Sequence, residues 1–161
     1  MTSKEYFKFL IYIHFAFNLG ALVIAFFLYY TYLGNPADPN VAEDLSILTT
    51  LGIIIAFGGV FFSAYTYKSK TLGLREVKNL SEKLSEYKSV SIISWTILEF
   101  STLINIVFFF LTGNELLFYI ALFLIALMFL KRPTRSRCRD SLGLNKEETR
   151  TIMSPDSIVI E

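Results

Sequence analysis

The chain has 161 residues, of which 53% are hydrophobic and 16% aromatic, while only 18% are charged. These values are typical of a small multi-pass membrane protein and argue against a soluble domain of this length. A formal net charge of +1 gives no basis for nucleic-acid binding. We therefore expect the lipid bilayer, and no nucleic acid, among the partners.

Four strongly apolar segments follow one another along the chain, at residues 9–33, 45–67, 89–112 and 115–131. The first three exceed the ~20 residues that a membrane-spanning helix needs, and the shorter fourth favours an upright helix. The segments lack the alternation of barrel strands, so we expect helices. The sequence predicts an all-α fold, an integral membrane four-helix bundle at residues 1–132 that is built from two hairpins.

The two predicted hairpins resemble each other in sequence. A shift of 81 residues aligns several pairs: Glu5 with Glu86, Tyr6 with Tyr87, His14 with Trp95, Asn18 with Glu99, and Phe27 with Phe108. An internal duplication would explain this correspondence and would give parallel repeats about an axis along the membrane normal. Chance similarity between apolar helices is the alternative, and the sequence leaves both open.

Positive charge is distributed unevenly between the predicted loops. The connection between the second and third segments and the tail after the fourth are rich in Lys and Arg, whereas the loops at 34–44 and 113–115 contain neither. The positive-inside rule therefore places both termini and the middle connection in the cytoplasm. We expect a multi-pass protein of the cell inner membrane.

The middle connection, residues 68–88, is expected to form an amphipathic cytoplasmic helix. Leu74, Val77, Leu84 and Tyr87 recur near one face at helical spacing, and charged residues occupy the rest. Such a helix would lie on the membrane surface, cover the cytoplasmic end of the bundle or pack on a partner.

The last part of the chain, residues 133–161, is predicted to be a short cytoplasmic tail that is basic and then acidic. Pro133 is expected to stop the fourth segment. Asn145 and Glu148 have the spacing of a capping box, which predicts a short final helix. We expect residues 154–161 to be loosely held.

Glu99 is the only charged residue in the third apolar segment, eleven residues after Lys88. At ~1.5 Å per residue, its carboxyl lies near the centre of a hydrocarbon layer ~30 Å thick. An ionised carboxylate there costs at least ~2.5 kcal/mol, so it needs to be paired, protonated or hydrated. Thr102 shares its helical face, and the 81-residue correspondence puts His14 and Asn18 at similar depth. We predict a polar cluster of Glu99, Asn18, His14 and Thr102.

Three interpretations of this cluster remain open. In the first, Glu99 binds and releases a proton or a cation, with Asn18 and His14 as hydrogen-bond partners, because intramembrane acids are functional by default. In the second, a protonated Glu99 forms a structural hydrogen bond between helices, worth ~0.6–2 kcal/mol. In the third, the carboxyl contacts another subunit or a lipid.

Small residues recur along the second segment at steps of four, three and four: Gly52, Ala56, Gly59 and Ser63. This spacing forms one stripe, which allows a neighbouring backbone to approach closely. We predict a helix-contact face, either inside the bundle or between protomers. Asn105 and Ser101 are expected to mark a second polar contact between helices.

Enzyme chemistry has little support in this sequence. The chain has one His and one Cys, without metal-ligand spacing. It also lacks a glycine-rich phosphate loop and a nucleophile with an adjacent base. We therefore expect a non-enzymatic protein without metal or cofactor, and a small membrane enzyme is the least supported alternative.

Three motifs in the second half of the chain resemble those of a family of small bacterial four-span proteins: Leu98-Glu99, Leu111-Thr112-Gly113-Asn114 and Lys131-Arg132-Pro133-Thr134. The resemblance implies an acid in the third span, a tight turn and a basic exit from the fourth, and it supplies no activity. A weaker similarity links the chain to the proteolipid ring subunits of rotary ATPases. In those proteins the acid belongs to the outer helix of a hairpin, whereas Glu99 lies in the first helix of its hairpin.

The sequence thus favours an accessory or assembly subunit of a membrane complex, or a small homo-oligomer. Short outer loops, the lack of a soluble domain and the small-residue stripe support this expectation. The main alternative is a subunit that translocates protons or cations through Glu99.

Overall fold

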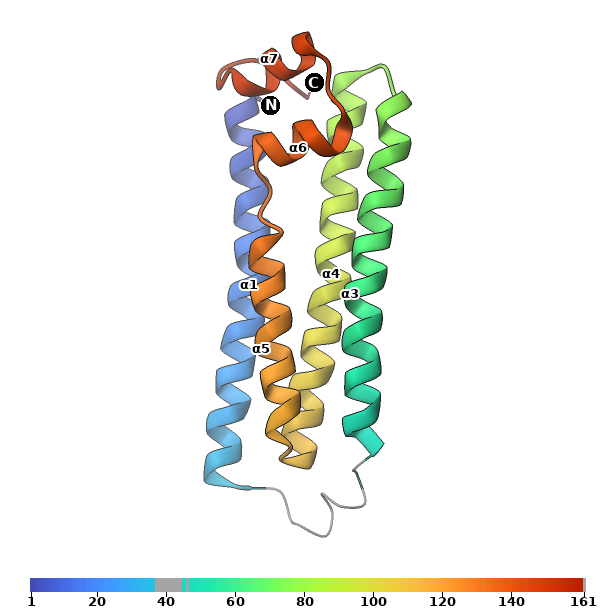
Figure 1. The fold of residues 1–161 in the computed structure, drawn as a ribbon. Helices are drawn as coiled ribbons and strands as arrows, with labels where there is room; N and C mark the ends of the chain where they lie inside the picture. The colour runs from blue at the N-terminus through green and yellow to red at the C-terminus, as the bar shows by residue number, and fades with distance from the viewer. Residues whose placement is uncertain (37–44, 46, 161) are drawn as a thin grey trace. The chain divides into compact units, whose positions relative to one another are not determined.

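The computed structural model describes residues 1–36, 45 and 47–160 (Figure 1). The regular elements in these ranges are all helical: α1 (Ser3–Gly34), α3 (Ile47–Gly73), the short 3-10 turn η1 (Leu74–Glu76), α4 (Leu80–Thr112), α5 (Glu115–Leu130), α6 (Arg135–Leu142) and α7 (Lys146–Met153). The predicted all-α class is confirmed. Most of the outer loop expected at 34–44 lies outside the described residues.

Three stretches of helix are long and apolar enough to cross a membrane: α1, α3 together with η1, and α4. A fourth span is reached only when α5 and α6 are counted together as one bent span. These helices fit a multi-pass membrane protein. They extend past the predicted apolar segments at several ends, because the flanking residues continue the helical backbone hydrogen bonding.

The separate amphipathic helix expected at residues 68–88 is not formed. α3 continues to Gly73, η1 follows, and α4 begins at Leu80. Asn79 explains this start, because its side-chain oxygen accepts hydrogen bonds from the backbone N–H of Ser81 at 2.9 Å and of Glu82 at 3.3 Å. An Asn at the N-cap favours a new helix over continuation of the previous one.

The described chain divides into two compact units. The terminal unit comprises Met1–Phe15, Ala64–Ser94 and Arg132–Glu161. The apolar unit comprises Ala16–Ser63 and Trp95–Lys131.

The core of the apolar unit joins α1, α4 and α5, whose segments run side by side in Figure 1. Its buried members are Ala25, Ile106, Phe109, Leu117, Phe118 and Ala121. Tyr29 of α1 stacks on Phe118 of α5 with ring centroids 4.7 Å apart, and on Phe109 of α4 at 5.8 Å. Stacked aromatic pairs contribute ~0.5–1.5 kcal/mol beyond their buried area, so they help to hold the three helices together.

A tight turn separates α4 from α5. Gly113 has φ of 67°, which a residue with a side chain adopts only with strain. Asn114 then caps α5 by accepting a hydrogen bond from the backbone N–H of Leu116 at 3.0 Å. At its other end α5 stops at Leu130, before Pro133, as the sequence predicts.

Residues 154–160 are not loose, which corrects the expectation for the end of the chain; Glu161 lies outside the described residues. The N-terminal amino group donates to the carbonyl of Ile160 at 2.6 Å, and Thr2 forms an antiparallel bridge with Ile158. The backbone N–H of Ser3 donates to Ser157 at 2.9 Å. The two termini therefore lie together beside α7, as Figure 1 shows. Backbone pairing that joins the two ends of a chain is invisible to local sequence patterns.

Tyrosine hydroxyls link the elements of the terminal unit. The hydroxyl of Tyr6, fully buried, donates to the carbonyl of Leu84 at 2.7 Å. The hydroxyl of Tyr67 donates to that of Tyr87 at 3.2 Å and lies 2.9 Å from the hydroxyl of Ser141. These contacts join α1, α3, α4 and α6, and they satisfy polar groups that would otherwise be costly to bury.

Candidate functional site

Glu99 lies on α4 in the apolar unit, against α1. Its Oε1 atom is 3.9 Å from the position that a Cβ would occupy at Gly20, which places the carboxyl against this part of α1. The side chain is partly exposed. Among the described residues, no hydrogen bond or ion pair reaches this carboxyl. The carboxyl of Glu99, which is costly to bury in an apolar segment, therefore has no compensating partner among the described residues.

The other three residues of the predicted polar cluster are all buried. Thr102 is fully buried, and its hydroxyl donates to the carbonyl of Leu98 at 2.8 Å, within its own helix. Asn18 is fully buried in the apolar unit, and His14 is 4% exposed in the terminal unit. The structure places Gly20 near the carboxyl of Glu99, and a common site formed by the four residues stays a prediction.

Gly52 and Gly59 of the small-residue stripe lie against other helices of the same chain. A Cβ at Gly52 would lie 2.5 Å from Cδ2 of Leu117 and 2.9 Å from Oδ1 of Asn105. A Cβ at Gly59 would overlap the side chain of Ser101. At both positions only glycine permits the observed approach of α3 to its neighbours.

Asn105 and Ser101, which were expected to mark a second polar contact between helices, face these glycines of α3, but their side-chain hydrogen bonds lie within α4. The Nδ2 atom of Asn105 donates to the carbonyl of Ser101 at 2.9 Å, and the hydroxyl of Ser101 donates to that of Ile97 at 3.0 Å. The Oδ1 atom of Asn105 is buried and lacks a conventional donor among the described atoms. It faces the backbone of Gly52, where a weak Cα–H donor is the available contact.

The remaining two stripe residues lie further along α3. Ser63 is fully buried, and its hydroxyl accepts a hydrogen bond from Nζ of Lys131 at 2.7 Å. Ala56 is 7% exposed and lines an apolar hollow together with residues of α5 such as Leu124. The contact with Lys131 was not predicted, because it joins residues far apart in the sequence.

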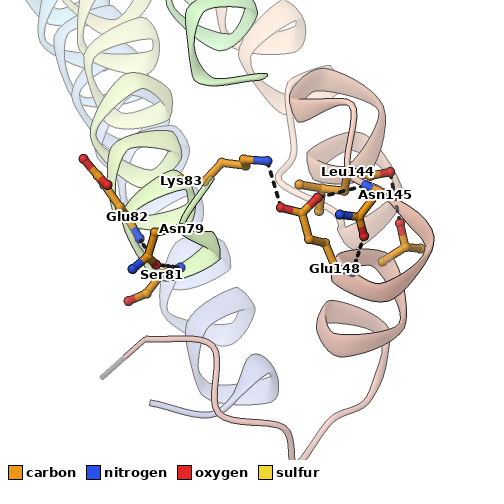
Figure 2. A network of polar contacts seen from close by, with 8 residues as sticks. Asn79, Ser81, Glu82, Lys83, Leu144, Asn145 and Glu148 are labelled. Carbon is orange, nitrogen blue, oxygen red and sulfur yellow. Dashed lines mark hydrogen bonds and ion pairs between the residues drawn. The ribbon is translucent and has the colours of Figure 1, made fainter. Parts of the chain in front are cut away.

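A buried polar network in the terminal unit was also missed by sequence reasoning (Figure 2). Nζ of Lys83 lies 2.8 Å from Oε1 of Glu148, and the two side chains are 5% and 14% exposed. Glu148 also completes the predicted capping box, since Asn145 accepts from its backbone N–H at 2.9 Å and donates to its Oε2 at 2.9 Å. The box is confirmed, whereas pattern reasoning placed Lys83 among the solvated charges.

The electrostatics of Glu148 follow from these contacts. Burial by itself raises the pKa of the carboxyl, but the hydrogen bond from Lys83, the N–H of Asn145 and the charge of Lys83 together lower the pKa below its usual value. Glu148 is therefore ionised at neutral pH, and the network fastens α7 to the first turn of α4.

Within 1–36, 45 and 47–160, no group of three or more His, Cys, Asp or Glu side chains is placed to hold a metal ion. What distinguishes this chain is the partly exposed acid inside an apolar helix.

No known protein family, curated protein or solved structure matches the chain significantly.

Proposed function

We propose that this protein is a non-enzymatic membrane subunit whose Glu99 is covered by a polar group from a second membrane protein or from a second copy of the chain. The observation that carries the proposal is the carboxyl of Glu99, which is partly exposed beside Gly20 and unpaired among the described residues. The proposal includes a bundle of four spanning helices in the inner membrane, with both termini cytoplasmic.

The energetics favour such a contact. An ionised carboxylate near the middle of a bilayer costs at least ~2.5 kcal/mol on the most lenient scale. A hydrogen bond from a neighbouring transmembrane helix recovers ~0.6–2 kcal/mol, and protonation of the acid removes most of the remainder. Because the polar hydroxyl of Thr102 is already used within α4, the compensating donor or acceptor comes most economically from outside the chain.

Site-specific photo-crosslinking in native membranes tests this proposal. Val23 lies three residues after Gly20 on α1 and is 59% exposed, so a photoreactive residue there would label whatever covers the Glu99 region. Phe123 on α5, 61% exposed, is the matched control. We expect a discrete adduct from position 23 and none from position 123, and its mass separates a second copy from another subunit.

Two variants connect the adduct to the acid itself. Glu99→Gln keeps hydrogen-bonding capacity, so the adduct is expected to remain, whereas Glu99→Leu is expected to abolish it. An adduct pattern that is the same at positions 23 and 123, or that survives Glu99→Leu, would contradict the proposal.

Proton or cation translocation through Glu99 is the second candidate. The partial exposure of the carboxyl favours it, because a group that titrates must be reachable by its ion. This candidate predicts that a hydrophobic carbodiimide reacts with Glu99 and that Na⁺ or high pH slows the reaction. It also predicts that Glu99→Gln and Glu99→Leu both lose function in cells, whereas a purely structural carboxyl tolerates Gln.

A further inference from the structure

A pocket of about 480 Å³ opens in the terminal unit between the first turns of α1 and the start of α6. Its lining residues are Lys4, Phe7, Lys8, Ile11, Arg132, Pro133, Thr134, Arg135 and Ser136. Phe7 and Pro133 are buried and form its apolar part, and four cationic side chains surround them. The pocket thus combines a basic rim with an apolar base.

The four cations have no anionic partner among the residues that the structure describes. No carboxylate among the described residues lies within ion-pair distance of Lys4, Lys8, Arg132 or Arg135. The nearby Glu5 is engaged elsewhere, because its Oε2 accepts from the backbone N–H of Thr2 at 2.8 Å. Four neighbouring positive charges without a counter-charge attract an anion.

Arg135 supplies a directed donor as well as charge. Its guanidinium lies over the ring of Phe7 at 5.7 Å, which holds the side chain in the pocket. Its Nε atom is buried and lacks an acceptor among the described atoms. A buried donor without an acceptor is unfavourable, and a guanidinium in this situation matches the oxygens of a phosphate.

The first turn of α6 adds further donors. Thr134 caps the helix by accepting from the N–H of Arg137 at 3.2 Å, which leaves the N–H groups of Arg135 and Ser136 without intrahelical acceptors. Both residues line the pocket. The positive end of a helix favours an anion at this place.

The position of the pocket along the chain identifies the anion. Lys8 directly precedes the apolar segment 9–33, and Arg132 directly follows the segment 115–131, so the rim lies at the expected depth of lipid headgroups. Beyond Lys8, Tyr12 and Phe15 continue along the same side of α1 at 61% and 53% exposure, where an acyl chain would lie. We propose that this pocket binds the phosphate of an anionic phospholipid headgroup.

Native mass spectrometry of the full-length protein in detergent tests the proposal. The probes are phosphatidylglycerol and phosphatidylcholine with identical acyl chains, and inorganic phosphate tests a free anion. We expect wild-type protein to retain phosphatidylglycerol over phosphatidylcholine, with no competition from millimolar phosphate. Equal retention of the two lipids, or displacement of phosphatidylglycerol by inorganic phosphate, would overturn the lipid assignment.

A pair of charge-matched variants locates the site. Lys8→Gln/Arg132→Gln removes two exposed charges of the pocket, and Lys70→Gln/Arg150→Gln removes two exposed charges elsewhere. At ~1 kcal/mol for each basic residue near an anionic surface, we expect a roughly tenfold or greater loss of phosphatidylglycerol affinity in the first variant only. Equal affinity in the two variants would contradict the site.

This inference uses the membrane insertion contained in the proposed function and is independent of Glu99. Loss of lipid preference in the pocket variant would leave the photo-adduct at position 23 unchanged. If the pocket variant does not fold, the comparison of the two lipids on wild-type protein still decides the proposal.

Discussion

Lys83 and Glu148 form an ion pair with an N–O distance of 2.8 Å, the same distance as in the pair between Arg139 and Asp140. The two pairs differ in their surroundings, because the side chains of the first are 5% and 14% exposed and those of the second are 44% and 64% exposed. Exposed ion pairs contribute ~0–1 kcal/mol, whereas removing one partner of a buried pair leaves an uncompensated charge. The two pairs therefore provide an internal comparison.

We expect Lys83→Met to lower the free energy of unfolding by about 3 kcal/mol, because it leaves the buried carboxylate of Glu148 without its cationic partner. Glu148→Gln keeps the capping box. This variant is also expected to be destabilising, because it leaves the buried ammonium group of Lys83 without its anionic partner. Arg139→Gln is the control and is expected to change stability by less than about 0.5 kcal/mol. Thermal unfolding of the full chain in detergent measures the three variants. Similar effects of Lys83→Met and Arg139→Gln would contradict this account.

The same carboxyl predicts how stability depends on acid. The pKa of Glu148 is lower in the folded protein than in an unfolded chain, where it is about 4.3. Its contribution to stability is therefore complete above the unfolded pKa and is lost as the pH falls through the folded pKa. Between about pH 6 and about pH 3, we expect the Tm of wild type to fall more than the Tm of Glu148→Gln. Parallel curves for the two proteins would argue against the assignment.

Adjacent glycines on α3 offer a test of the helix contact. A Cβ at Gly59 would overlap Ser101, whereas a Cβ at Gly58 would meet nothing within 4 Å. We expect Gly59→Ala to destabilise the protein by ~1–3 kcal/mol through overpacking, and Gly58→Ala to leave stability unchanged or slightly raised. Thermal unfolding in detergent distinguishes these outcomes.

A compensating change makes the glycine prediction more specific. Ser101→Gly removes the side chain that the new methyl group would strike, so the double variant Gly59→Ala/Ser101→Gly is expected to recover most of the lost stability. If Gly58→Ala is as harmful as Gly59→Ala, the close contact is not the reason for the glycine.

Cys138 is expected to be inert toward thiol reagents in the folded protein. The side chain is fully buried, and burial raises the pKa of its thiol to about 12. Only the thiolate is the nucleophile, so its reaction with a maleimide at about pH 7.5 should be at least ~100-fold slower than in denaturant. Ser154→Cys, at an exposed position, provides a control that should react at once. Rapid modification of native wild-type protein at Cys138 would contradict the buried position.

Much of the fold can be predicted from the sequence, because the sequence signals for helices and helix ends are local. The apolar segments predict the long helices, Asn145 and Glu148 predict the start of α7, and Pro133 predicts the end of the fourth segment. Each of these signals acts through neighbours within a few residues, and periodicity and capping rules describe such interactions well.

The errors occurred where a local pattern competes with distant contacts. The amphipathic pattern of 68–88 predicts one helix, whereas in the structure Asn79 starts α4 inside this range. The polar end of the chain was expected to be loose, although residues such as Ser157 pair with the N-terminus. Lys83 lies among the charged residues of that pattern, and only the folded structure shows its ion pair with Glu148 of α7. Such contacts are set by three-dimensional proximity, which no single stretch of sequence encodes.

The sequence by itself determined that this is an all-helical protein with membrane-length apolar segments and an acid inside one of them, because hydrophobicity is a property of composition and spacing. Only the tertiary structure decided which neighbours that acid has. It placed Gly20 beside Glu99, with no polar partner among the described residues, and it gathered around one pocket four cations that have no carboxylate partner in the described part of the chain. Whether a charge is compensated depends on which side chains packing brings within a few ångströms, and packing is decided by the whole chain at once.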